Sequence, residues 1–154
     1  MRTGWNVALQ VGALVAAALL RLTAPGWLLA ILIFTVVGLV LLLVPPALSL
    51  VVLRWGRLRR ATSAPFLAAA GFLLLAALVL PDQGDGPVGA TPVLVLLGVE
   101  GSPAWAWTVG SLALAAYLLS VLWLAIALGI TAARRRPRPH GSSTDTPYGS
   151  SPAR

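Results

Sequence analysis

Polar side chains that could do chemistry are few and uncharged within the apolar segments of this sequence. Asn6 and Gln10 have i, i+4 spacing in the first segment, which places them on one face of a helix. Ser49, Tyr117 and Ser120 interrupt two later segments. Inside a bilayer their amide and hydroxyl groups need partners within the protein, because lipid chains offer none. These residues predict an intramembrane polar seam, which either joins helices or lines a polar path or ligand cavity.

Two adjacent prolines, Pro45 and Pro46, lie in the second apolar segment. Proline has no N–H to donate to the carbonyl four residues earlier, so the carbonyls of Leu41 and Leu42 need another partner. We therefore expect a helix kink here. Gln10 and Tyr117 are expected to share a contact beside it, on the cytoplasmic side of the bundle.

Ionisable residues are absent from these segments apart from Arg21, at the end of the first one. Proton-coupled transport and intramembrane proteolysis rely on such groups. The sequence also has no cysteine, and His140, its only histidine, lies in a polar tail. We expect no catalytic, cofactor or metal site, and no enzymatic activity. Small multidrug-resistance transporters, which are also short four-span chains, depend on a glutamate in the first span that is missing here.

The composition, 58% hydrophobic and 10% charged, excludes a soluble globular domain. Its apolar residues form runs long enough to cross a bilayer. We predict an all-α integral membrane protein with a four-span antiparallel transmembrane helix bundle in residues 1–133. The expected spans are 5–22, 27–53, 61–80 and 104–131. The first is interpreted as a retained span rather than a cleaved signal peptide.

The basic residues orient this bundle, since arginines in short loops stay on the cytoplasmic side. Both termini are therefore expected to be cytoplasmic, with Arg21 as an outer exception whose side chain reaches the headgroups. The clustered arginines are too few for a nucleic-acid surface and are expected to contact anionic lipid headgroups instead. They are Arg54, Arg57, Arg59, Arg60, Arg134, Arg135, Arg136 and Arg138.

Small residues recur at every fourth position of the first span: Gly4, Ala8, Gly12 and Ala16. Such a ridge lets another helix approach closely. Because a short Pro-Gly turn joins the first two spans, the ridge is expected to pack within the chain. The alternative is an interface with a second copy or a partner.

The external loop, 81–103, contains an apolar stretch, 92–99, that is too short to span. It is compatible with a lid on the bundle, a shallow re-entrant segment or a docking strand for a partner. Asp82 and Asp85 lie in a Gly- and Pro-rich stretch without the spacing of a calcium loop. We interpret that stretch as a solvated turn.

The last segment, 134–154, changes abruptly to Arg, Pro, Ser, Thr and Gly, which predicts a disordered basic cytoplasmic tail. All basic residues of the chain are arginine, a bias typical of a GC-rich coding genome. We expect a multi-pass protein of the cell membrane, in the cytoplasmic membrane of a GC-rich bacterium.

Two functions are compatible with these features. The first is a non-enzymatic structural or accessory subunit of a membrane complex, whose partners are the lipid bilayer and another membrane protein or a second copy. The second is an oligomeric channel or carrier for a neutral or lipophilic solute, built around the polar seam.

Overall fold

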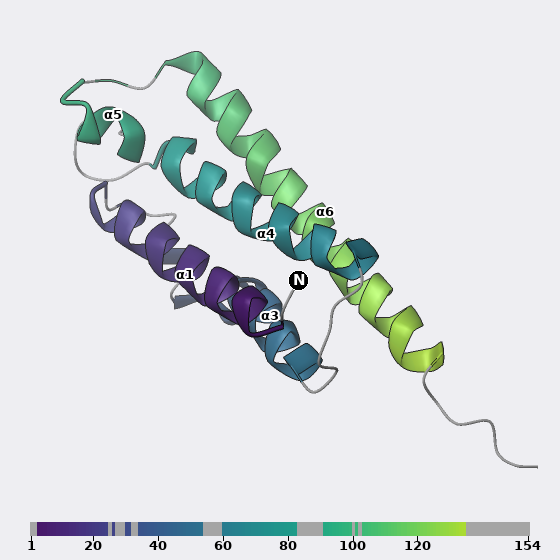
Figure 1. Cartoon of the computed structure of the whole chain (residues 1–154). Coiled ribbons are helices and arrows are strands. Elements are labelled where there is room, and N and C mark those ends of the chain that lie inside the picture. The colour runs from purple at the N-terminus through teal and green to yellow at the C-terminus, as the bar shows by residue number, and fades with distance from the viewer. Residues whose placement is uncertain are drawn as a thin grey trace, which may run out of the picture.

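A computed structural model describes residues 3–24, 26, 30–31, 34–53, 60–82, 91–99, 101 and 103–134. The elements in these residues are α-helices: α1 (Thr3–Leu22), α3 (Val36–Leu53), α4 (Arg60–Val79), α5 (Pro92–Leu96) and α6 (Ala104–Arg134). The prediction of an all-α chain is therefore confirmed for the described residues. The long helices lie alongside one another and alternate in direction (Figure 1).

Three of these helices, α1, α3 and α6, are long and apolar enough to cross a membrane, and the fourth apolar helix is shorter, Ser63–Val79. At 1.5 Å per residue, α1 covers about 30 Å, close to the thickness of a hydrocarbon core. Helices of this length and composition indicate an integral membrane protein.

Helix α4 is the centre of the bundle, and it packs most extensively against α6 and next against α1. Its buried positions are mostly alanines, including Ala69, Ala70, Ala76 and Ala77, which let neighbouring helices approach closely. Phe66 is the large exception, and it packs with Val52 of α3 and with Leu124 and Leu128 of α6.

Within the second predicted span, 27–53, helix α3 begins at Val36, and the described residues Ala30, Ile31 and Phe34 before it are also helical. Thr35 caps this helix: its Oγ1 accepts a hydrogen bond from the Gly38 N–H at 3.1 Å and donates one to the Ile31 carbonyl at 2.6 Å. Residues 27–29 and 32–33 lie outside the described residues.

The small-residue ridge of α1 does not pack within the chain, contrary to the prediction. Gly4, Ala8 and Gly12 are exposed, and a Cβ built at either glycine would meet nothing within 4 Å. The face of α1 that packs on its neighbours is a different one, with the buried residues Thr3, Asn6, Gln10, Ala13, Ala17 and Arg21.

The apolar stretch of the external loop forms the short helix α5, next to α4 at one end of the bundle (Figure 1). Pro92 is its first residue and is buried. Gly98 ends the helix with φ +68°, and the Val99 N–H donates to the Leu94 carbonyl at 2.9 Å. This helical conformation excludes the docking strand.

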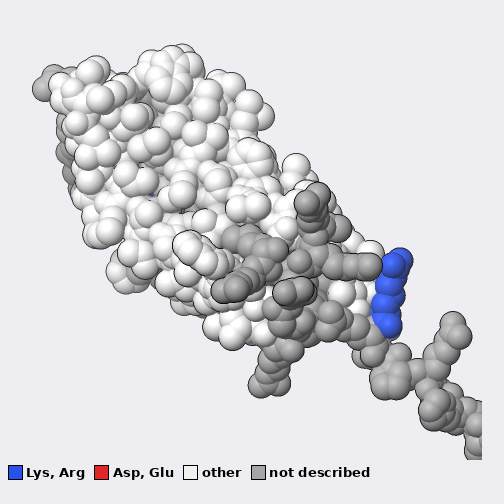
Figure 2. Space-filling model, viewed as in Figure 1, with Lys and Arg blue, Asp and Glu red and all other residues white. Residues whose placement is uncertain are grey.

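The outward faces of the long helices are apolar. Among them, Val36 and Val37 of α3 and Leu112 and Leu119 of α6 are each at least 65% exposed. Figure 2 shows almost no charge on this side of the bundle, apart from a basic side chain at the end of α6. Such a surface is suited to lipid contact rather than to water.

Candidate functional site

Gln10, the first of the predicted seam residues, joins α1 to α4. Its side-chain amide is buried and donates a hydrogen bond to the backbone carbonyl of Phe66 at 2.8 Å. A glutamine at this depth is stabilised by such a bond, because the lipid offers no acceptor.

Tyr117 joins α6 to α3 in the same manner. Its hydroxyl donates to the backbone carbonyl of Leu41 at 2.7 Å, and its ring packs with Ala69 and Val121. Leu41 is the residue whose carbonyl loses its usual donor to Pro45. The tyrosine therefore supplies the hydrogen bond that the proline cannot make, and α3 continues as one helix through Pro45 and Pro46.

The remaining seam residues do not connect helices by a hydrogen bond. Ser49 donates to the Pro46 carbonyl and Ser120 to the Ala116 carbonyl, both at 2.7 Å and both within their own helices. Asn6 is fully buried, and neither atom of its side-chain amide has a hydrogen-bond partner.

The contact expected between Gln10 and Tyr117 is not formed. Each side chain donates to a different carbonyl, on different helices. Both are occupied in holding the bundle together.

Arg21 lies in the last turn of α1, and its side chain is buried within the bundle instead of extending away from it. It is 4% exposed, and its Nη2 donates to the Ala76 carbonyl of α4 at 3.0 Å. Its Nη1 lies 3.8 Å from Oδ2 of Asp82. Asp82 is itself 4% exposed, so the interpretation of this position as part of a solvated turn is wrong; Asp85 lies outside the described residues.

Two glycines surround the ion pair with close backbone packing. A Cβ at Gly26 would lie 2.5 Å from Cγ of Asp82, and a Cβ at Gly110 would lie 2.5 Å from Cα of Leu80. Only glycine allows these approaches. The chain is therefore closely packed at Leu80 and Asp82, and we call the end of the bundle that contains Arg21 and Asp82 the outer end.

The sequence contained a signal for this ion pair. Arg21 was the only arginine assigned to the external side, and Asp82 comes directly after the next helix that ends on that side. In a bundle of alternating helices these two positions lie at the same end. Opposite charges at the same end of a bundle predict an ion pair, which is not evident when each residue is considered alone.

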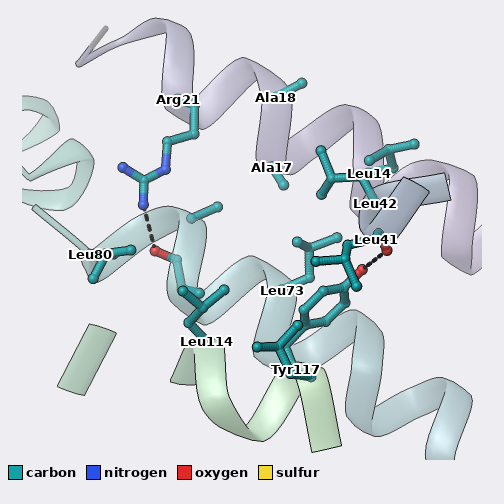
Figure 3. A pocket seen from close by; sticks show the side chains of 13 residues that line it. Leu14, Ala17, Ala18, Arg21, Leu41, Leu42, Leu73, Leu80, Leu114 and Tyr117 are labelled. Carbon is teal, nitrogen blue, oxygen red and sulfur yellow. Dashed lines mark hydrogen bonds between the residues drawn. The ribbon is translucent and has the colours of Figure 1, made fainter. Parts of the chain in front are cut away.

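A partly enclosed apolar cavity of about 140 Å³ lies between α1, α3, α4 and α6. Figure 3 shows Arg21 at one end of this cavity and Tyr117 at the other, each donating to a backbone carbonyl. Leucine and alanine side chains line the space between them, among them Leu14, Leu73 and Leu114.

Most of the arginines predicted to contact anionic lipid lie outside the described residues: Arg54, Arg57, Arg59, Arg135, Arg136 and Arg138. Arg60 is the first residue of α4, and Arg134 is the last residue of α6 and is exposed. Both helix ends lie at the opposite end of the bundle from Arg21, which we call the inner end (Figure 1).

Comparisons of the chain with protein-family models, with curated proteins and with solved structures find no match. Within the part of the chain that the structure describes, no three histidine, cysteine or carboxylate side chains form a group that could hold a metal ion. The candidate site is thus the cavity with the hydrogen-bonded side chains at its two ends.

Proposed function

We propose that this chain is a non-enzymatic structural or accessory subunit of a membrane complex. It crosses the cytoplasmic membrane of a GC-rich bacterium with α1, α3, α4 and α6. Both of its termini are cytoplasmic, so the inner end faces the cytoplasm. Its arginines at that end contact anionic lipid, and its partner is another membrane protein or a second copy of the chain.

The observation that carries this proposal is that buried polar side chains form hydrogen bonds between helices. Gln10, Arg21 and Tyr117 come from two helices, and each donates to a backbone carbonyl of a different helix. Hydrogen bonds of this kind stabilise helix association in membranes, each by roughly 0.6 to 2 kcal/mol. Groups committed to such bonds serve a scaffold better than a polar permeation path.

The channel or carrier for a neutral or lipophilic solute is the competing function, and the two differ in solute transport and in whether a different membrane protein is bound. Photocrosslinking of the full chain in native membranes, followed by mass spectrometry, distinguishes them. Recovery of one specific membrane protein supports the accessory subunit. Crosslinks to further copies of the chain alone, together with solute uptake by reconstituted vesicles, would overturn it.

Reporter fusions test the proposed topology independently. Reporters placed after Arg60, after Asp85 and at Arg154 are expected to be cytoplasmic, external and cytoplasmic, because the arginine-rich segments stay inside. An external reading at Arg154 would contradict the four-span arrangement.

A further inference from the structure

The cavity between the four long helices is lined almost entirely by hydrocarbon. From Leu14 to Arg21 of α1 it extends about 10 Å along the helix axis, and α4 contributes Leu73 and Ala77 to its wall. The groups at its two ends, the Arg21 guanidinium and the Tyr117 hydroxyl, donate to backbone carbonyls (Figure 3). The space between them therefore offers little to a polar molecule.

A water-filled cavity does not suit this space, and an empty one carries a cost. A water molecule needs two to four polar partners, which leucine and alanine side chains do not supply. An empty cavity lowers stability, because the atoms that line it lose their packing contacts. An apolar cavity of about 150 Å³ holds a guest of the size of benzene. A volume of about 140 Å³ thus matches a short segment of one alkyl chain, not a whole lipid.

The two ends of the cavity also differ in polarity. Arg21 lies in the last turn of α1, at the outer end of the bundle, and its Nη1 has no hydrogen-bond partner but lies 3.8 Å from Oδ2 of Asp82. Tyr117 lies near the middle of α6, deep within the bundle. A guanidinium–carboxylate pair at the ends of the helices, followed by hydrocarbon toward their middle, matches the order in which a lipid presents its polar headgroup region and its chains.

We propose that the cavity binds a segment of one acyl chain of a lipid from the outer leaflet. The oxygen-rich headgroup region lies at the Arg21 end, and the chain points toward Tyr117. This proposal rests on the proposed function insofar as the bundle must span the bilayer. It adds a ligand class, a long-chain lipid, and a site for it.

A photoreactive lipid tests the proposal. The full chain is reconstituted in phosphatidylcholine vesicles that contain a phosphatidylcholine with a diazirine in the middle of one acyl chain, and labelled residues are identified by mass spectrometry after irradiation. Ala77 is 5% exposed, whereas Leu112 and Leu119 of α6 are 65% and 67% exposed. We expect label on Ala77 and Leu73 as well as on Leu112 and Leu119.

Label on Leu112 and Leu119 without label on Ala77 and Leu73 would overturn the cavity site and leave the membrane-spanning arrangement intact. Absence of label from all of these residues would mean that the chain is not in the bilayer, and both proposals would then fail.

A cavity-filling variant sharpens this test. Ala77→Leu fills part of the cavity. We expect the larger side chain to weaken binding of the acyl chain by about 1.4 kcal/mol, so that label on Leu73 falls about tenfold. Ala115→Leu, at an exposed position of α6, is the matched control and should leave the label unchanged. Ala18 also lines the cavity and is exposed, so Ala18→Leu gives a second variant if Ala77→Leu does not fold. Undiminished label on Leu73 in a folded cavity variant would overturn the proposal.

Discussion

The outer and inner halves of the bundle are held together by different interactions. At the outer end, Arg21 and Asp82 form a buried ion pair beside two glycine contacts that leave no room for a Cβ. In the inner half, neutral side chains such as Gln10 donate to backbone carbonyls, and Phe66 packs in an apolar cluster.

This difference predicts how each half tolerates change. A buried charge whose partner is removed is strongly destabilising, because nothing else compensates it. A neutral hydrogen bond in a membrane contributes much less. The outer end should therefore be sensitive to single substitutions, while the inner half should lose stability in small steps.

The largest effect is expected from Asp82→Asn, which leaves the Arg21 guanidinium buried without a counter-charge. The free energy of unfolding in lipid–detergent micelles should fall by about 3 to 5 kcal/mol. The double variant Arg21→Met with Asp82→Asn should be more stable than Asp82→Asn alone, because no uncompensated charge remains. If Asp82→Asn is as stable as wild type, the Arg21 guanidinium must reach water. The outer and inner halves would then not differ in their sensitivity to substitution.

The next largest effect is expected at the contact between α6 and the end of α4. Gly110→Ala places a methyl group 2.5 Å from Cα of Leu80, so the backbone must shift, and we expect a loss of about 1 to 3 kcal/mol in the same assay. Gly129→Ala is the matched control on the same helix, where a Cβ would meet nothing within 4 Å. It should be neutral or stabilise by about 0.5 to 1 kcal/mol. Equal effects of the two changes would show that the outer end is not closely packed.

Smaller effects are expected for Gln10→Leu and Tyr117→Phe, at about 0.6 to 1.7 kcal/mol each. Tyr117→Phe should be the more costly, because the Leu41 carbonyl has no other helical donor, whereas Ala70 retains an N–H for the Phe66 carbonyl. The two effects should add in the double variant, since the side chains share no partner. A clear departure from additivity would connect the two bonds and contradict their independence.

The smallest effect is expected beyond the inner end. Truncation after Arg138 removes a segment without apolar runs. The free energy of unfolding should therefore stay within about 0.5 kcal/mol of wild type. The amount of protein in the membrane should equal that of wild type within experimental error. A marked loss on truncation would mean that the inner half depends on the tail as well.

The helices were largely predictable from the sequence, because apolar runs bounded by charge, glycine or proline define them. α1, α4 and α6 begin and end within a few residues of the predicted spans 5–22, 61–80 and 104–131. α3 differs because Thr35 can cap a helix within an apolar run, and hydropathy alone does not register a cap.

For the candidate site, the sequence predicted the polar residues but not the groups to which they bind. Gln10 and Tyr117 were identifiable because polar groups in apolar runs must find partners. Their hydrogen-bond partners were not identifiable, because every residue has a backbone carbonyl. The rotation of each helix about its axis decides which carbonyl a side chain reaches. The pair of Arg21 and Asp82 was missed for another reason: each had an acceptable separate explanation, and only their shared position at the outer end connects them.

The bond from Tyr117 to Leu41 also has a consequence for the order in which the protein is made. The carbonyl of Leu41 needs a donor that Pro45 cannot supply, and that donor lies on α6, which is synthesised after α3 and α4. During translation this carbonyl therefore lacks the Tyr117 hydroxyl until α6 has been made. The hydrogen bond that satisfies this carbonyl of α3 thus forms only when α6 joins the bundle.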